Sequence, residues 1–289
     1  MLNDRRLRRP SAPRTLHVGD LRVSYVPDGA MLLKPAGSLR PAAYRSYLND
    51  TGHLVANIGG LLVQRGTRAL LIDTGLGPHS VPARPEAPAD LVGATGPPGR
   101  RAEPADDARR HGAAAHGGSL PGNLARLGPG PEGIEVVAFT RLHLDQLGWA
   151  SVRPPVFTRA TFVVPAGAWD GPVPELPPAL RRRLRRVVPG EEVFPGVRAL
   201  ALPGHTGFTI TSRGERLLAF GGALHSPVQV RHPEWSLLPD ADPRGATARR
   251  RRLIAELQRA DTLGFGSYFA DVVFGRVRLA AEGLHWHPE

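Results

Sequence analysis

Residues 140–148 read TRLHLDQLG, and this stretch decides the fold. The residues before it, 135–140, predict a strand, so its histidine, aspartate and glutamine lie on a loop that leaves a sheet. Functional side chains are commonly placed on such loops, and we expect a site there. Four further polar segments follow predicted strands in the same way: Asp73-Thr74-Gly75, Pro203-Gly204-His205-Thr206, Gly221-Gly222-Ala223-Leu224-His225 and Gly266-Ser267-Tyr268-Phe269.

Around these loops the pattern predicts two sheets packed face to face with helices outside, in one domain over residues 1–289. Residues 78–118 are dense in Pro, Gly and Ala and predict a long irregular excursion. The predicted helices are Ser119–Leu127, Pro178–Val187 and Ala246–Ala260. The predicted strands are a hairpin over Arg14–Pro27 that turns at Gly19-Asp20, then Val55–Gln64, Ala69–Ile72, Glu135–Thr140, Ala160–Val164, Val197–Leu202, Thr209–Ser212, Arg216–Phe220, Thr262–Phe265 and Val272–Leu279.

Composition narrows the classes of function. The absence of cysteine excludes disulfides and cysteine-ligated metals and favours a cytoplasmic location. No apolar run of about 18 residues is present, which predicts no membrane partner. The net charge of +11 comes almost wholly from arginine, since Lys34 is the only lysine, and no aromatic residues interleave with the arginine clusters. A nucleic-acid partner is therefore not expected, and a small-molecule substrate is. The sequence does not indicate the oligomeric state.

The order and spacing of the polar segments resemble the metallo-β-lactamase superfamily, in particular its lactonase-like hydrolase branch. The resemblance covers residues 21–279 apart from the excursion, and it implies an α/β (α+β) fold, a four-layer αββα sandwich with the site at one edge of the two sheets. In that family seven His and Asp ligands hold two zinc ions, which activate a water and polarise a carbonyl. Supporting stretches are Asn57-Ile58-Gly59-Gly60, Leu71-Ile72-Asp73-Thr74-Gly75, Gly148-Trp149-Ala150-Ser151 and His225-Ser226-Pro227-Val228-Gln229.

Carried over residue by residue, the family's ligand pattern is only partly present. The His-x-His-x-Asp-His motif falls on Arg141, His143, Asp145 and Gln146, so its first and last histidines are replaced. The next histidine is kept as His205, the bridging aspartate position falls on Gly222, and the final histidine position falls on Tyr268. The kept ligands are thus His143, Asp145 and His205. A guanidinium at 141 cannot ligate zinc and repels it.

We therefore expect a pocket without metal or cofactor, in which the charges of Arg141 and Asp145 balance. The resemblance places His143, Asp145, His205 and Tyr268 there as the catalytic acid–base set. The predicted substrate-binding residues are Arg141, Gln146, His225 and Trp149, with Arg141 suited to a carboxylate or an oxyanion. The favoured function is metal-independent acid–base chemistry of the lyase, isomerase, dehydratase or cyclase type on a small metabolite, for example a carboxylated one in a biosynthetic pathway.

Two alternatives stay open. The chain can be a non-catalytic protein whose pocket binds a metabolite or a partner. It can also be a mononuclear zinc hydrolase of esters or lactones, with one zinc on His143, Asp145 and His205. Each residue alone can also have a purely structural role, with His143 bonded to the backbone and Tyr268 packed in the core. An enzyme is favoured because the residues fall together at one inferred pocket.

Overall fold

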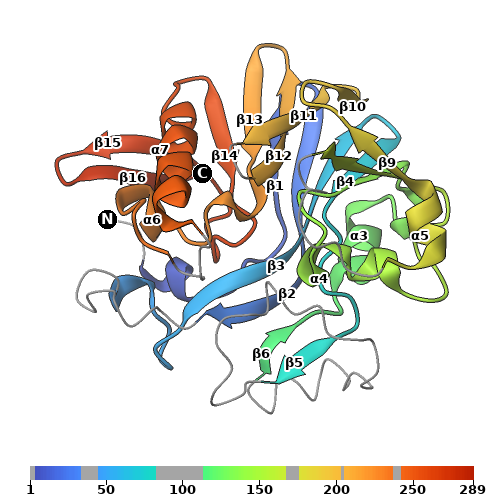
Figure 1. Cartoon of the computed structure of the whole chain (residues 1–289), viewed down its shortest axis with the longest axis horizontal. Coiled ribbons are helices and arrows are strands. Elements are labelled where there is room, and N and C mark those ends of the chain that lie inside the picture. The colour runs from blue at the N-terminus through green and yellow to red at the C-terminus, as the bar shows by residue number, and fades with distance from the viewer. Residues whose placement is uncertain (1–3, 34–44, 83–112, 167–175, 203–204, 237–241) are drawn as a thin grey trace.

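Two β-sheets pack face to face, and helices cover the outer face of each (Figure 1). The computed structural model describes residues 4–33, 45–82, 113–166, 176–202, 205–236 and 242–289. Helices α3, α4 and α5 lie on one side of the molecule, and α6 and α7 lie on the other. The expected four-layer αββα sandwich, the fold class predicted from the sequence, is confirmed.

In the described part the first sheet has nine strands, in the order β5-β6-β2-β3-β4-β7-β8-β9, with β1 also paired to β2. Gly19, in the left-handed conformation, makes the tight turn between β1 and β2. Parallel pairing joins β4 to β7, β7 to β8 and β8 to β9. The strands are β1 (Arg14–Val18), β2 (Leu21–Leu33), β3 (Leu54–Arg65), β4 (Arg68–Ile72), β5 (Ser80–Pro82), β6 (Ala113–His116), β7 (Val136–Ala138), β8 (Thr161–Pro165) and β9 (Leu184–Val187).

The second sheet contains seven strands among the described residues, in chain order from β10 to β16. Every neighbouring pair is antiparallel except β13 and β14, which run parallel because α7 crosses between them. The strands are β10 (Glu192–Phe194), β11 (Val197–Leu202), β12 (His205–Ser212), β13 (Glu215–Ala219), β14 (Thr262–Phe265), β15 (Phe274–Ala280) and β16 (Gly283–Pro288).

The main core lies between the sheets, where Tyr25, Leu61, Phe208, Leu217 and Phe265 are buried together. Each sheet also has an apolar cluster on its outer face, between the sheet and the helices that cover it. None of the helices in the described ranges is long and apolar enough to cross a membrane. The helices are α3 (Leu120–Leu127), α4 (Leu144–Leu147), α5 (Pro178–Arg183), α6 (Val228–Arg231) and α7 (Pro243–Leu257), with short 3-10 turns at Asp4–Arg8, Arg45–Tyr47, Pro131–Gly133, Trp149–Ser151 and Gly221–Ala223.

Three predictions about the elements need correction. The helix predicted over Pro178–Val187 ends at Arg183, because residues 184–187 pair with β8 as strand β9. The excursion over 78–118 is not irregular throughout, since its two ends form β5 and β6 and extend the sheet beyond β2. Its central residues, 83–112, lie outside the described residues. The last strand, β16, has no counterpart among the predicted strands.

Candidate functional site

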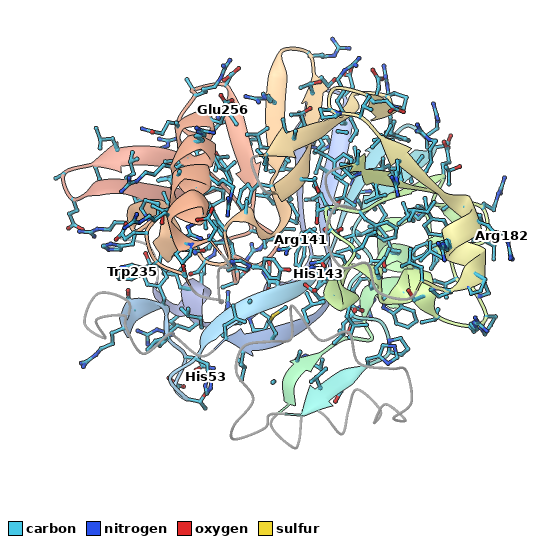
Figure 2. All side chains as sticks on the ribbon, in the orientation of Figure 1. His53, Arg141, His143, Arg182, Trp235 and Glu256 are labelled. Atoms are coloured by element: carbon cyan, nitrogen blue, oxygen red, sulfur yellow. The ribbon has the colours of Figure 1, made fainter. Side chains whose placement is uncertain are left out.

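The loops singled out by the sequence meet at one edge of the sandwich. Parallel pairing brings the carboxyl ends of β4 and β7 together, and the same holds for β13 and β14. The loops that leave these four strands carry Asp73, Arg141 to Asp145, Gly222 and Tyr268. Figure 2 shows Arg141 and His143 beside each other near the centre of the view, where the two halves of the molecule meet. The fold thus assembles most of the predicted residues into one site.

At the centre of the site, three side chains form a closed hydrogen-bond network. The Tyr268 hydroxyl donates to Asp145 Oδ2 over 2.6 Å, and the Gln146 amide donates to the same oxygen over 2.7 Å. The Gln146 amide also lies 2.8 Å from the Tyr268 oxygen and donates to it. All three side chains are buried. Burial, and then the adjacent Asp145 carboxylate, raise the pKa of Tyr268 well above its usual value. The phenol therefore keeps its proton and donates a hydrogen bond to the carboxylate.

Arg141 occupies space that the absence of a side chain at Gly222 leaves open. A Cβ at position 222 would lie 3.2 Å from Arg141 Nη1 and 3.6 Å from the Tyr268 ring. The arginine is half-buried, and within the described residues its guanidinium has no hydrogen bond or ion pair. The expected charge balance thus does not take the form of a direct pair with Asp145, because Tyr268 and Gln146 hold that carboxylate. A half-buried cation without a fixed partner is suited to bind an anionic group.

His143 is the residue immediately before α4 and is half-buried. Burial, followed by repulsion from Arg141, lowers its pKa, while Asp145 opposes the shift. The imidazole is therefore neutral at neutral pH, with a lone pair that can accept a proton or a ligand. No side-chain hydrogen bond of His143 is found among the described residues, so the structural role of bonding to the backbone is not observed there.

A second buried carboxylate, Asp73, lies beneath the site at the end of β4. It accepts hydrogen bonds from the Thr140 backbone N–H at 2.8 Å and from the Thr140 hydroxyl at 2.7 Å. Burial raises its pKa to about 7, against the effect of these bonds. The sequence analysis named the Asp73-Thr74-Gly75 segment among the loops of the expected site but gave its aspartate no role. Its left-handed backbone, with φ of 61°, was signalled only by the Asp-Thr-Gly turn chemistry.

The other predicted site residues have different positions. Trp149 donates its indole N–H to Asp28 over 2.7 Å, so this polar group is occupied inside the protein. The His225 ring lies 5.3 Å from the Tyr268 ring, at the rim of the network. His205 begins β12 opposite Leu202, and its side chain lies outside the part of the chain that is described. The substrate-binding roles of Trp149 and His225 stay predictions.

Asp28 of β2 is a structural residue that the sequence analysis did not identify. Its side chain is fully buried and accepts five hydrogen bonds, four from backbone N–H groups and one from Trp149. The backbone donors are on Leu76, Gly77, Gly118 and Leu120. Asp28 thereby fixes the loop after β4, the start of α3 and the Trp149 turn to one another.

The residues present do not fit a two-metal centre. Asp145 Oδ2 accepts two hydrogen bonds, and the Arg141 guanidinium lies 3.2 Å from the position where a side chain at residue 222 would begin. Within the described side chains, no group of three His, Cys, Asp or Glu residues is placed to hold a metal ion. A single-metal site that includes His205 is outside this test.

Solved structures of similar shape carry the same fold. The dizinc quorum-quenching lactonase AidC superposes with a TM-score of 0.73 at 19% identity, over 96% of this chain and 98% of that one. The hydrolase AbOPH of the β-lactamase superfamily gives 0.73 at 20% identity, over 96% and 98%. A probable metal-dependent hydrolase from Staphylococcus aureus gives 0.70 at 16%, over 95% and 99%. No protein-family model and no curated protein sequence matches the chain.

The chain has the metallo-β-lactamase fold, as the resemblance in its sequence implies. Its neighbours in structure include lactonases and other hydrolases. At these identities the similarity establishes the fold alone, so the chemistry has to be argued from the side chains.

Proposed function

We propose that this protein is a metal-independent enzyme that moves protons on a small metabolite, in a lyase, isomerase, dehydratase or cyclase reaction. One observation carries the proposal: the Tyr268 hydroxyl and the Asp145 carboxylate form a buried pair 2.6 Å apart, in a site whose ligands do not suit two metals. The phenol keeps its proton at neutral pH because its pKa is raised, so it can donate a hydrogen bond or a proton to a basic substrate atom, and the carboxylate beside it can accept one.

The remaining side chains support specific roles. Arg141 binds the substrate's anionic group, for which a carboxylate is the best match because a guanidinium can hold both of its oxygens. Gln146 donates hydrogen bonds to both Asp145 and Tyr268 and so fixes their relative positions. His143, neutral at neutral pH, is a second base within the same site. His205 completes the proposed acid–base set from the start of β12.

Deuterium exchange tests the proposal across a whole class of substrates. The protein is incubated in D₂O with a panel of carboxylated metabolites, and loss of C–H signals is followed by NMR. We expect exchange with at least one compound, and Asp145→Asn and Tyr268→Phe should each lower its rate at least about a hundredfold. Tyr25→Phe is the matched control, because that buried hydroxyl bonds to the Ile58 carbonyl between the sheets. Wild-type rates in both site variants would refute the acid–base assignment, and binding without exchange would favour a non-catalytic protein.

Metal analysis separates this proposal from the zinc hydrolase that the structural neighbours suggest. Protein purified without chelator should contain no stoichiometric zinc, and EDTA should change neither its melting temperature nor its exchange activity. The measurement is elemental analysis of wild type beside His143→Ala. Stoichiometric zinc that disappears in the variant, together with esterase or lactonase activity sensitive to EDTA, would establish the alternative instead.

A further inference from the structure

The loop that carries Tyr268 makes hydrogen bonds and ion pairs with the amino-terminal part of the chain. We call residues 266–272 the Tyr268 loop and residues 4–14 the amino-terminal arm. Arg6 of the arm and the Asp271 backbone of the loop exchange two hydrogen bonds. The Asp271 N–H donates to the Arg6 carbonyl over 3.0 Å, and Arg6 Nε donates to the Asp271 carbonyl over 2.9 Å. The arm thus contacts the loop three residues after the tyrosine.

The Asp271 side chain makes the strongest contacts between the two segments. It is 2% exposed, and each of its oxygens accepts from a different arginine of the arm. Arg9 donates to Oδ2 through Nη2 and Nε at 2.7 and 3.0 Å, and Arg14 donates to Oδ1 at 2.5 and 3.1 Å. These bonds hold the pKa of Asp271 below its usual value, against the opposing effect of burial. Paired charge-assisted bonds of this kind fix orientation as well as position.

A third contact connects the arm, the loop and the first sheet. The Asn57 side chain of β3 accepts from the Ser11 N–H over 2.8 Å and donates to the Ala270 carbonyl over 2.5 Å. Asn57 is buried, and both of its functional groups are therefore used to join these segments. The motif Asn57-Ile58-Gly59-Gly60, noted in the sequence, thus has a structural explanation at its first residue.

The loop needs these constraints because its backbone is strained. Ala270 has φ of 39°, in the left-handed region that residues with a Cβ avoid. Such a conformation is unfavourable and persists only where the surrounding contacts hold it in place. Contacts at the Ala270 carbonyl and at the next residue, Asp271, hold this conformation in place.

We infer that the amino-terminal arm is a positioning device for the Tyr268 hydroxyl, with Asp271, Arg9 and Arg14 as positioning residues. The inference rests on the proposed function for its catalytic meaning, but the geometry it claims can be measured without a substrate. When the arm contacts are lost, the Tyr268 loop relaxes, and the hydroxyl leaves its 2.6 Å bond to Asp145.

The test is NMR of the folded protein with ¹³Cζ-labelled tyrosine. The chain has four tyrosines, and the Tyr268→Phe spectrum identifies the signal of interest. The double variant Arg9→Gln with Arg14→Gln removes the bonds to Asp271 by changing the arm. Asp271→Asn removes them by changing the loop. We expect the Tyr268 signal to shift toward that of free tyrosine in both variants, while the buried Tyr25 signal stays in place. Arg213→Gln is the matched control, since it breaks an exposed ion pair with Asp20 far from the loop in the sequence.

A conservative variant, Arg14→Lys, and the results that would contradict the inference complete the experiment. Arg14→Lys keeps the positive charge but not the pair of hydrogen bonds from one guanidinium. It should shift the Tyr268 signal less than Arg14→Gln does. An unchanged Tyr268 signal in the folded double arginine variant would overturn the inference, even if Asp271→Asn fails to fold. A shifted signal together with normal deuterium exchange would sustain the positioning but contradict the proposed chemistry, so the two ideas fail separately.

Discussion

Asp28→Asn is expected to lower the free energy of unfolding by about 3–5 kcal/mol. The Asp28 carboxylate accepts five hydrogen bonds in a fully buried position. An amide has one acceptor oxygen, so at least two buried donors would face an NH₂ group instead. A buried donor without an acceptor costs about 1–3 kcal/mol. Urea unfolding followed by circular dichroism measures the loss.

Asp20→Asn is the control for Asp28→Asn. Asp20 forms an exposed ion pair with Arg213, so its loss should change stability little. We also expect Asp28→Asn to disturb the site, because the same carboxylate fixes Trp149 and the loop that follows Asp73. A stability equal to that of wild type would show that Asp28 does not organise these loops.

The second large effect is a fall in stability with rising pH that depends on Asp73. Burial raises the pKa of Asp73 from 3.8 to about 7. The folded state therefore binds a proton that the unfolded state has already released, and the contribution to stability is full below pH 3.8 and is lost as the pH rises to about 7. One pKa unit corresponds to about 1.4 kcal/mol, so the loss is about 4 kcal/mol over the whole window.

Asp73→Asn isolates this contribution. The amide oxygen can still accept from the Thr140 N–H, and the NH₂ group can donate to the Thr140 hydroxyl, so the variant resembles the protonated acid. The measurement is urea unfolding of both proteins from about pH 5 to about pH 8. The variant should gain about 2–3 kcal/mol relative to wild type across that range. Parallel curves for the two proteins would mean that Asp73 ionises normally.

Local sequence patterns predicted most of the sandwich because its strands are apolar and end in turns. The Gly19-Asp20 turn and the Asp73-Thr74-Gly75 segment ended strands where the structure ends them. Strand β9 was missed because its residues continue the helical spacing of apolar residues and arginines that begins at Pro178. Only pairing with β8 makes this segment a strand. Strand β16 contains two histidines and a proline, and only its contact with β15 decides its conformation.

The motif order predicted which side chains lie near one another, and their roles stay predictions. His143, Asp145, Gln146 and Tyr268 lie together as the motif order implies. The partners within that set were not predictable, since charge alone favours a direct Arg141–Asp145 pair. Asp28 and Asp271 gave no signal at all, because their importance comes from donors more than 40 residues away in the chain.

The missing side chain at Gly222, whose space Arg141 occupies, is a small change at the level of the gene. Glycine and aspartate codons can differ at the middle base alone, and so can those of arginine and histidine. Glutamine differs from histidine at the third base, and tyrosine differs from it at the first. Every departure that the resemblance implies at 141, 146, 222 and 268 is thus within reach of a single nucleotide change. Four point mutations would therefore convert the proposed site into the family's ligand pattern.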